Sequence, residues 1–155
     1  MTAGETYNLT TFPTPGTPAT RAGAPLLSIL NMKIQPDSIS VQSISGYGPG
    51  WIGIGGEKVT LSVVLGSRGE RFNWNCRRFE DLGPAHFAQL AALNAELVVF
   101  GSGERIRFPP PDWIRPLIEK QTGVETMDTQ AACRTYNILA SEGRSVVAAL
   151  LLETT

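Results

Sequence analysis

The chain has 155 residues, of which 42% are hydrophobic and 17% charged, and its formal net charge is −1 at pH 7. This length suggests one domain, and the hydrophobic fraction is large enough to build a buried core. The near-neutral charge argues against a nucleic-acid partner, because binding to phosphates requires a basic surface that displaces counterions. No run approaches the roughly 20 apolar residues that a membrane span needs, so no span is expected.

Residues that bind metals or act as nucleophiles are few. The chain contains 2 cysteines, Cys76 and Cys133, and 1 histidine, His86. Neither cysteine belongs to a CxxC motif or a Cys/His cluster, so we expect no metal site and no cofactor. The first residues lack the basic start and apolar stretch of a secretory signal. We therefore expect a cytoplasmic protein whose thiols are reduced.

The first 25 residues are rich in Thr, Pro, Gly and Ala and show neither helical nor strand periodicity. A segment of this kind cannot bury enough apolar surface to offset the entropy lost on ordering. We predict a flexible arm over residues 1–25, followed by a single globular domain over residues 26–155.

Residues 38–75 have the pattern of a β region. Apolar residues alternate with polar or small ones in SISVQSIS, WIGIG, EKVTLSVVL and RFNWN. Gly55 and Gly56 separate two of these runs, which predicts a hairpin turn. The sequence GYGPG at residues 46–50 predicts a second connection between strands, because glycine tolerates positive φ angles.

From residue 81 the pattern changes to alternating helices and strands. A helix is expected to begin near Pro84, since proline suits the first helical turn. The apolar runs at residues 96–100 and 145–152 are typical of strands covered on both faces. Together with a short strand at residues 124–126, they predict a mostly parallel βαβαβ unit with right-handed crossovers.

Two more helices complete this unit. Asp112 is expected to cap a helix that runs to about residue 121, with Pro116 confined to its first turn. Asp128 or Thr129 is expected to cap a helix over residues 129–142. The fold class is therefore α/β (α+β), with a hairpin-rich N-terminal β part.

Polar residues follow two of the predicted strands where each strand ends. Ligands of parallel sheets bind beyond the carboxyl ends of the strands, and the start of the 129–142 helix favours an anion. The residues at this rim predict a pocket for a small acid or phosphate, whereas the alternative is a tight turn without a ligand. The candidate binding residues are Gly101, Ser102, Gly103, Arg105, Arg107, Thr126, Asp128 and Thr129.

Cys133 lies near the start of the 129–142 helix and beside Arg134. A helix N-terminus and a nearby cation both lower a thiol pKa, so Cys133 is a candidate reactive thiol. The alternative is that Cys133 packs as a small apolar residue at the border of the helix's buried face. The chain shows no pattern of nucleophile, base and orienting group, so no catalytic residue is assigned.

Three segments carry a resemblance to a known family. They are ISGYGPGWIGIGGEKVTLSVVL, GSGER with PPPDW, and VETMDTQAACRTYNILASEGRSVVAALL. Over residues 33–152 the chain resembles a small family of domains of unknown function. Its members include archaeal and bacterial single-domain proteins, an adipogenesis-associated Mth-type domain protein and a mitochondrial assembly factor for respiratory complex I (NADH:ubiquinone oxidoreductase).

The resemblance implies a three-layer β/β/α fold, and it supplies no catalytic residues. It favours a non-enzymatic binding or assembly module with a protein partner. The alternative is a protein or enzyme that binds a small anion or metabolite at the rim formed by residues 101–107 and 126–130.

Overall fold

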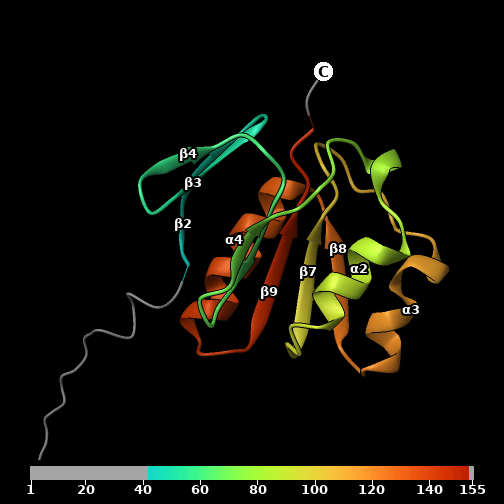
Figure 1. Cartoon of the computed structure of the whole chain (residues 1–155). Coiled ribbons are helices and arrows are strands. Elements are labelled where there is room, and N and C mark those ends of the chain that lie inside the picture. Colours follow the sequence, from blue (N-terminus) through green and yellow to red (C-terminus); the bar gives the residue numbers. More distant parts are fainter. Residues whose placement is uncertain (1–41, 154–155) are drawn as a thin grey trace, which may run out of the picture. The chain divides into compact units, whose positions relative to one another are not determined.

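The computed structural model describes residues 42–153, with short strands first and alternating helices and strands after them (Figure 1). The predicted arm over residues 1–25 and the first half of the SISVQSIS run, residues 38–41, lie outside the described residues. The strands are β2 (Ile44–Gly48), β3 (Trp51–Ile54), β4 (Glu57–Val59), β5 (Val63–Gly66), β6 (Arg71–Asn73), β7 (Leu97–Gly101), β8 (Gly123–Met127) and β9 (Val146–Leu150). The helices are the 3₁₀ helix η1 (Phe79–Asp81), α2 (Pro84–Ala91), α3 (Pro111–Glu119) and α4 (Thr129–Ser141).

Strands β2, β3 and β4 form a small antiparallel sheet in that order. Gly55 and Gly56 form the turn between β3 and β4 with φ angles of 58° and 86°, so the predicted hairpin is confirmed. A side chain at either position would be strained, because this is the left-handed region that favours glycine.

The predicted single run over residues 57–65 is wrong in one respect, because it divides into two strands of different sheets. Residues 57–59 form β4 of the small sheet, and residues 63–66 form β5 of a larger one. Val59 and Val63 both lie in the same buried cluster. The chain thus crosses from one layer to the next while the apolar residues on both sides of the crossing stay buried.

The larger sheet has five strands in the order β6-β5-β9-β7-β8. Strands β9, β7 and β8 are parallel, whereas β5 is antiparallel to β9 and β6 is antiparallel to β5. Every residue of β9 is buried, as its continuous apolar run predicted. The α/β class and the parallel C-terminal unit are therefore confirmed.

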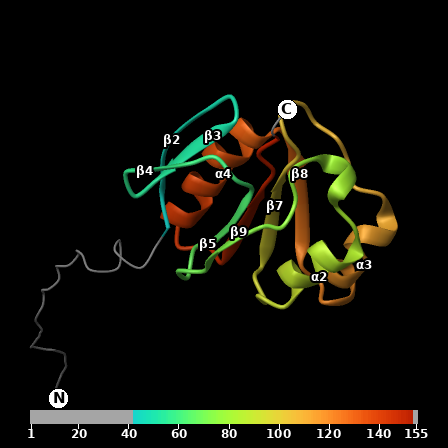
Figure 2. The same cartoon turned by 45° about the horizontal axis from the view of Figure 1, so that its top comes forward.

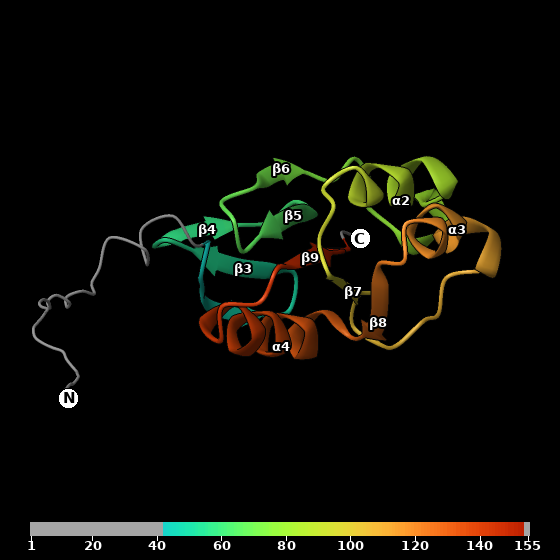
Figure 3. The ribbon, with the colours of Figure 1, turned by 90° about the horizontal axis from the view of Figure 1, so that it is seen from below.

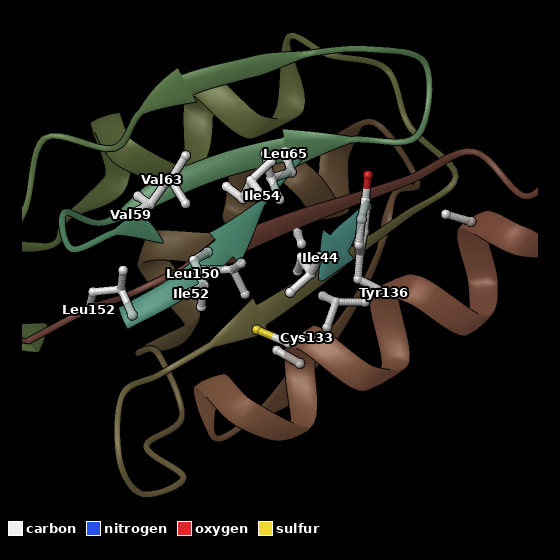
Figure 4. Packing of buried hydrophobic residues seen from close by; sticks show 14 of the residues in the cluster. Ile44, Ile52, Ile54, Val59, Val63, Leu65, Cys133, Tyr136, Leu150 and Leu152 are labelled. Carbon is white, nitrogen blue, oxygen red and sulfur yellow. The ribbon is translucent and has the colours of Figure 1, made fainter. Parts of the chain in front are cut away.

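Two apolar clusters, one on each face of the large sheet, hold the layers together. On one face, α4 and the small sheet cover the strands (Figures 2 and 4). On the other face, α2 and α3 cover them, as the view from below shows (Figure 3). Alternate residues of the strands serve the two clusters: Val99 and Ala148 face α4, and Val98 and Val147 face α2 and α3. This alternation follows from the period of two along a strand.

The predicted start of α3 is wrong. The helix begins at Pro111 rather than after a cap at Asp112, and Pro116 lies inside it rather than in the first turn. Proline at this position leaves the carbonyl of Asp112 without its usual donor. Because Asp112 is exposed, water can satisfy that carbonyl, and the short helix tolerates the interruption.

Candidate functional site

Ser102 follows β7 directly and is completely buried at the carboxyl end of the sheet. Its hydroxyl donates to the carbonyl of Arg105 at 2.7 Å, and the carbonyl of Met127 lies 3.2 Å away. The same oxygen accepts the backbone N–H of Arg107 at 2.8 Å. The hydroxyl therefore holds the 102–107 turn closed and joins it to the end of β8.

Thr129 connects the turn to the start of α4. Its hydroxyl donates to the carbonyl of Leu151 at 2.8 Å and accepts the backbone N–H of Gly103 at 2.9 Å. Gly101 allows this approach, because a Cβ atom there would lie 2.9 Å from the Thr129 Cα atom. The ends of β7 and β9 and the beginning of α4 are thus joined through one buried hydroxyl.

Arg107 folds back over the same region. Its Nη2 atom lies 2.6 Å from both the carbonyl of Ser102 and the Glu153 carboxylate, and its guanidinium lies 4.9 Å from the centre of the Phe79 ring. An arginine that is paired and stacked in this way has its charge largely compensated. Arg107 is therefore a structural cation of the turn.

The remaining predicted rim residues are placed differently. Asp128 caps α4, and its carboxylate accepts the backbone N–H of Ala131 at 2.9 Å. Of the two predicted caps, Asp128 and Thr129, the structure therefore confirms Asp128. Thr126 is half-buried in β8, and Arg105 is exposed. The structure thus brings Gly103, which follows Ser102, into direct contact with Thr129, and it leaves Arg105 exposed.

Two depressions adjoin this rim. A narrow groove lies between the β2–β3 turn and the start of α4, and it is lined by Tyr47, Thr129 and Glu153 among others. An open depression of about 350 Å³ adjoins it, lined by Pro49, Gly103, Glu104, Asp128 and Gln130. The charged side chains among these described lining residues are carboxylates, which disfavour an anionic ligand by charge repulsion.

Cys133 is fully buried, not at the border of the helix face where the sequence placed it. Its side chain points from α4 into the cluster beneath the small sheet (Figure 4). Burial raises the pKa of the Cys133 thiol to about 12, and this outweighs the opposing effect of Arg134. Burial likewise raises the pKa of Cys76 to about 11. Since the thiolate is the reactive form, these environments favour packing over nucleophilic chemistry.

Among the described residues, no hydrogen bond links His86 to Cys76 or Cys133. Its Nε2 atom lies 2.8 Å from the carbonyl of Asn75, at the half-exposed start of α2. Cys76 and Cys133 lie in clusters on opposite faces of the large sheet. Within residues 42–153, no group of three His, Cys, Asp or Glu side chains is arranged to hold a metal ion. No helix in the same part of the chain is long and apolar enough to cross a bilayer.

Two exposed apolar residues beside this rim were not singled out by sequence reasoning. Phe108 is 73% exposed and Ile106 is 52% exposed, both on the loop between β7 and α3. The prolines after them mark a stiff connector, and Trp113 anchors it by packing against Phe79 with ring centroids 5.3 Å apart. The sequence RIRF at residues 105–108 carried a signal, because the apolar Ile106 and Phe108 alternate with arginines. Arg107, between the two apolar residues, is held against the protein.

Comparisons with known proteins agree with this architecture. The family described as "Protein of unknown function (DUF498/DUF598)" matches residues 44–151. The chain is similar to a solved protein from Bordetella parapertussis, with 36% identity, a TM-score of 0.70, and coverage of 74% of this chain and 98% of that one. It is also similar to a Mth938-like domain from Bordetella pertussis, with 31% identity, a TM-score of 0.68, and coverage of 79% and 93%.

Curated relatives include a protein named NADH dehydrogenase [ubiquinone] 1 alpha subcomplex assembly factor 3. The Xenopus tropicalis protein is 28% identical over 121 residues, which cover 77% of this chain and 66% of that protein. The Bos taurus protein is 35% identical over 80 residues, which cover 50% of this chain and 44% of that protein. The chain thus spans less than two thirds of these relatives. The match over residues 44–151 and the shared fold show that the chain belongs to the DUF498/DUF598 (Mth938-like) family of unknown function.

Proposed function

We propose that this protein is a non-enzymatic, assembly-type module that binds a protein partner through the loop between β7 and α3. The observation that carries the proposal is the exposure of Phe108 and Ile106 on a loop whose backbone is fixed from within. Large aromatic and aliphatic side chains that protrude from a rigid support are typical anchors of protein interfaces. The names of the assembly-factor relatives support a partner of this class.

The internal contacts of the loop explain how it presents these side chains. Ser102 holds the backbone at Arg105 and Arg107, and Arg107 is paired with Glu153. Pro110 has φ and ψ angles of −57° and 147°, which are those of a polyproline II segment. A loop that is already ordered loses little conformational entropy when it binds, so its exposed apolar area contributes more fully to affinity.

The test is affinity purification from the native cell, read by quantitative mass spectrometry, with the wild type and two matched variants. The double variant Ile106→Ser/Phe108→Ser should lose a partner that the wild type captures. The control Ile138→Ser removes a side chain that is 57% exposed on α4, and it should retain the partner. Equal recovery of the same proteins by all three forms would contradict the proposal.

A small-ligand function at the rim is the second candidate. The groove beside Tyr47 and Thr129 favours it, since a ligand there would lie at the carboxyl end of the parallel strands and near the start of α4. Titration of isotope-labelled protein with inorganic phosphate and nucleotides tests this candidate. Chemical shifts that move at Gly103 and Thr129 would favour a ligand, and an unchanged spectrum would contradict an anion site at the rim.

A further inference from the structure

β8 is the last strand of the five-stranded sheet, and its outer side faces no other strand in the part of the chain that the structure describes (Figure 3). Its inner side pairs with β7. At one end, the Gly123 N–H donates to the carbonyl of Glu96, and at the other, the Met127 carbonyl accepts the N–H of Ser102. Because the direction of backbone groups alternates along a strand, residues 123, 125 and 127 bond to β7 and the two residues between them point outward.

The outward residues are Val124 and Thr126. The β7–β8 register leaves their N–H and C=O groups facing away from β7, and within residues 42–153 no bond outside the strand ladders reaches these groups. The small sheet treats an edge differently: the Asn137 side chain of α4 donates to the Ile44 carbonyl and accepts the Ile44 N–H, at 2.8 and 3.0 Å. At Ile44 the edge of β2 is therefore closed by a side-chain amide that bonds as a neighbouring strand would, whereas β8 offers two donors and two acceptors.

We propose that β8 accepts an extended segment of a partner protein as a sixth, antiparallel strand of the sheet. Val124 and Thr126 would each exchange two backbone hydrogen bonds with the incoming segment, as in other cases of strand addition to a sheet edge. The inference relies on the proposed function only for the partner being a protein. The surface is a different one from the exposed side chains of Ile106 and Phe108.

Glu125 determines which segment fits. It is exposed on β8 and forms no ion pair among the described residues. In the proposed pairing it faces the central residue of the incoming strand, with Cα atoms about 4.5 Å apart. A second copy of β8 paired through all four open groups would place Glu125 opposite itself, and like charges directly opposite destabilise a sheet. The central residue of the partner segment is therefore Lys or Arg.

The residues that flank this basic residue lie on the other face of the sheet, beside Val124 and Thr126. Val124 packs against the apolar cluster under α3. β-branched neighbours pair well with one another across strands, so the flanking positions favour Val, Ile or Thr. The partner segment is thus an extended run of the pattern β-branched, basic, β-branched.

The test uses a capped peptide, acetyl-Thr-Thr-Val-Lys-Val-Thr-Thr-amide, titrated into isotope-labelled protein and followed by NMR. We expect the amide signals of Val124 and Thr126 to shift and their exchange with solvent to slow. A peptide with Glu in place of Lys should bind at least about threefold more weakly, and Glu125→Lys should reverse this preference. High salt should reduce both differences.

Thr126→Pro and Thr126→Val form the matched pair. Proline is tolerated where an edge N–H points outward, so this variant keeps the fold but loses a donor, and peptide binding should fall about tenfold. Thr126→Val keeps the N–H group and should bind as the wild type does. Equal affinity for the Lys and Glu peptides, or no response at Val124 and Thr126, would overturn the inference. Neither result would affect the purification test of the loop between β7 and α3, so the two proposals can fail independently.

Discussion

The rim at the carboxyl end of β7 and the loop that leaves it differ in what their side chains contact. At the rim, the hydroxyls of Ser102 and Thr129 are buried, and both are used in hydrogen bonds to backbone groups of the same chain. On the loop, Phe108 is 73% exposed and Ile106 is 52% exposed. The difference teaches that polar residues beyond a parallel strand can serve the fold, while apolar residues next to them are available to a partner.

The largest expected effect concerns the close approach of β7 to α4. A Cβ atom at Gly101 would lie 2.9 Å from the backbone of Thr129 and 3.1 Å from the side chain of Ala132. Gly101→Val should therefore lower the free energy of unfolding by about 3 kcal/mol, measured by urea denaturation. Gly46→Ala is the control, since its Cβ atom would make an ordinary contact at 3.5 Å with Trp51. Equal losses for the two variants would show that the approach at Gly101 is not tight.

The next effect concerns the buried hydroxyl of the turn. Ser102→Ala leaves the N–H of Arg107 and the carbonyl of Arg105 without their partner. Loss of these part-buried hydrogen bonds should cost about 1–3 kcal/mol of unfolding free energy. Ser141→Ala, which removes an exposed hydroxyl bonded within α4, should cost under about 0.5 kcal/mol. An unchanged denaturation midpoint for Ser102→Ala would mean that the hydroxyl does not hold the turn.

The buried thiol of Cys133 predicts a loss of stability at alkaline pH. Its pKa rises from 9.0 to about 12 on folding, so the unfolded chain ionises first. The stabilisation is complete below pH 9 and declines as the pH rises towards 12, by about 1–2 kcal/mol at pH 10.5. Cys133→Ala should reduce the difference in unfolding free energy between pH 8 and pH 10.5. The same difference in the variant and the wild type would contradict the assigned environment of the thiol.

The smallest effect on stability is expected on the loop. Phe108→Ser removes a residue that is 73% exposed, so it should change the unfolding free energy by less than about 0.5 kcal/mol. Ile106→Ser removes a half-exposed residue and should cost up to about 1 kcal/mol. Thermal denaturation measures this directly. A large loss of stability would show that these side chains pack in solution and would weaken their role as partner anchors.

Several parts of the fold could be predicted because their signals are local. The turn at Gly55 and Gly56 requires positive φ angles, and Asp128 offers an oxygen to the free amides of the first helical turn. The order of strands followed by helices and strands could be predicted from the change of period. The two-sided burial of β9 could be predicted from its unbroken apolar run.

Other parts depend on contacts between distant segments, which no local pattern carries. Cys133 is buried because the small sheet lies over α4, a packing that the period of the helix does not contain. Asn137 is a polar residue of α4 whose amide bonds to the edge of β2, 93 residues away in the chain, and no local pattern indicates that partner. At the candidate site, sequence reasoning brought the right segments together. It could not show that the hydroxyls of Ser102 and Thr129 form their hydrogen bonds with backbone groups of the protein itself.

The most direct test of the central claim compares Ser102→Ala with Phe108→Ser in one experiment that measures both unfolding free energy and capture of the native partner. The account predicts that Ser102→Ala loses about 1–3 kcal/mol of unfolding free energy. At a temperature where this variant is folded, it should still capture the partner, but more weakly than the wild type, because its loop is less ordered. It predicts that Phe108→Ser keeps its stability and loses the partner. The opposite result, with partner capture lost in folded Ser102→Ala and retained in Phe108→Ser, would contradict the account.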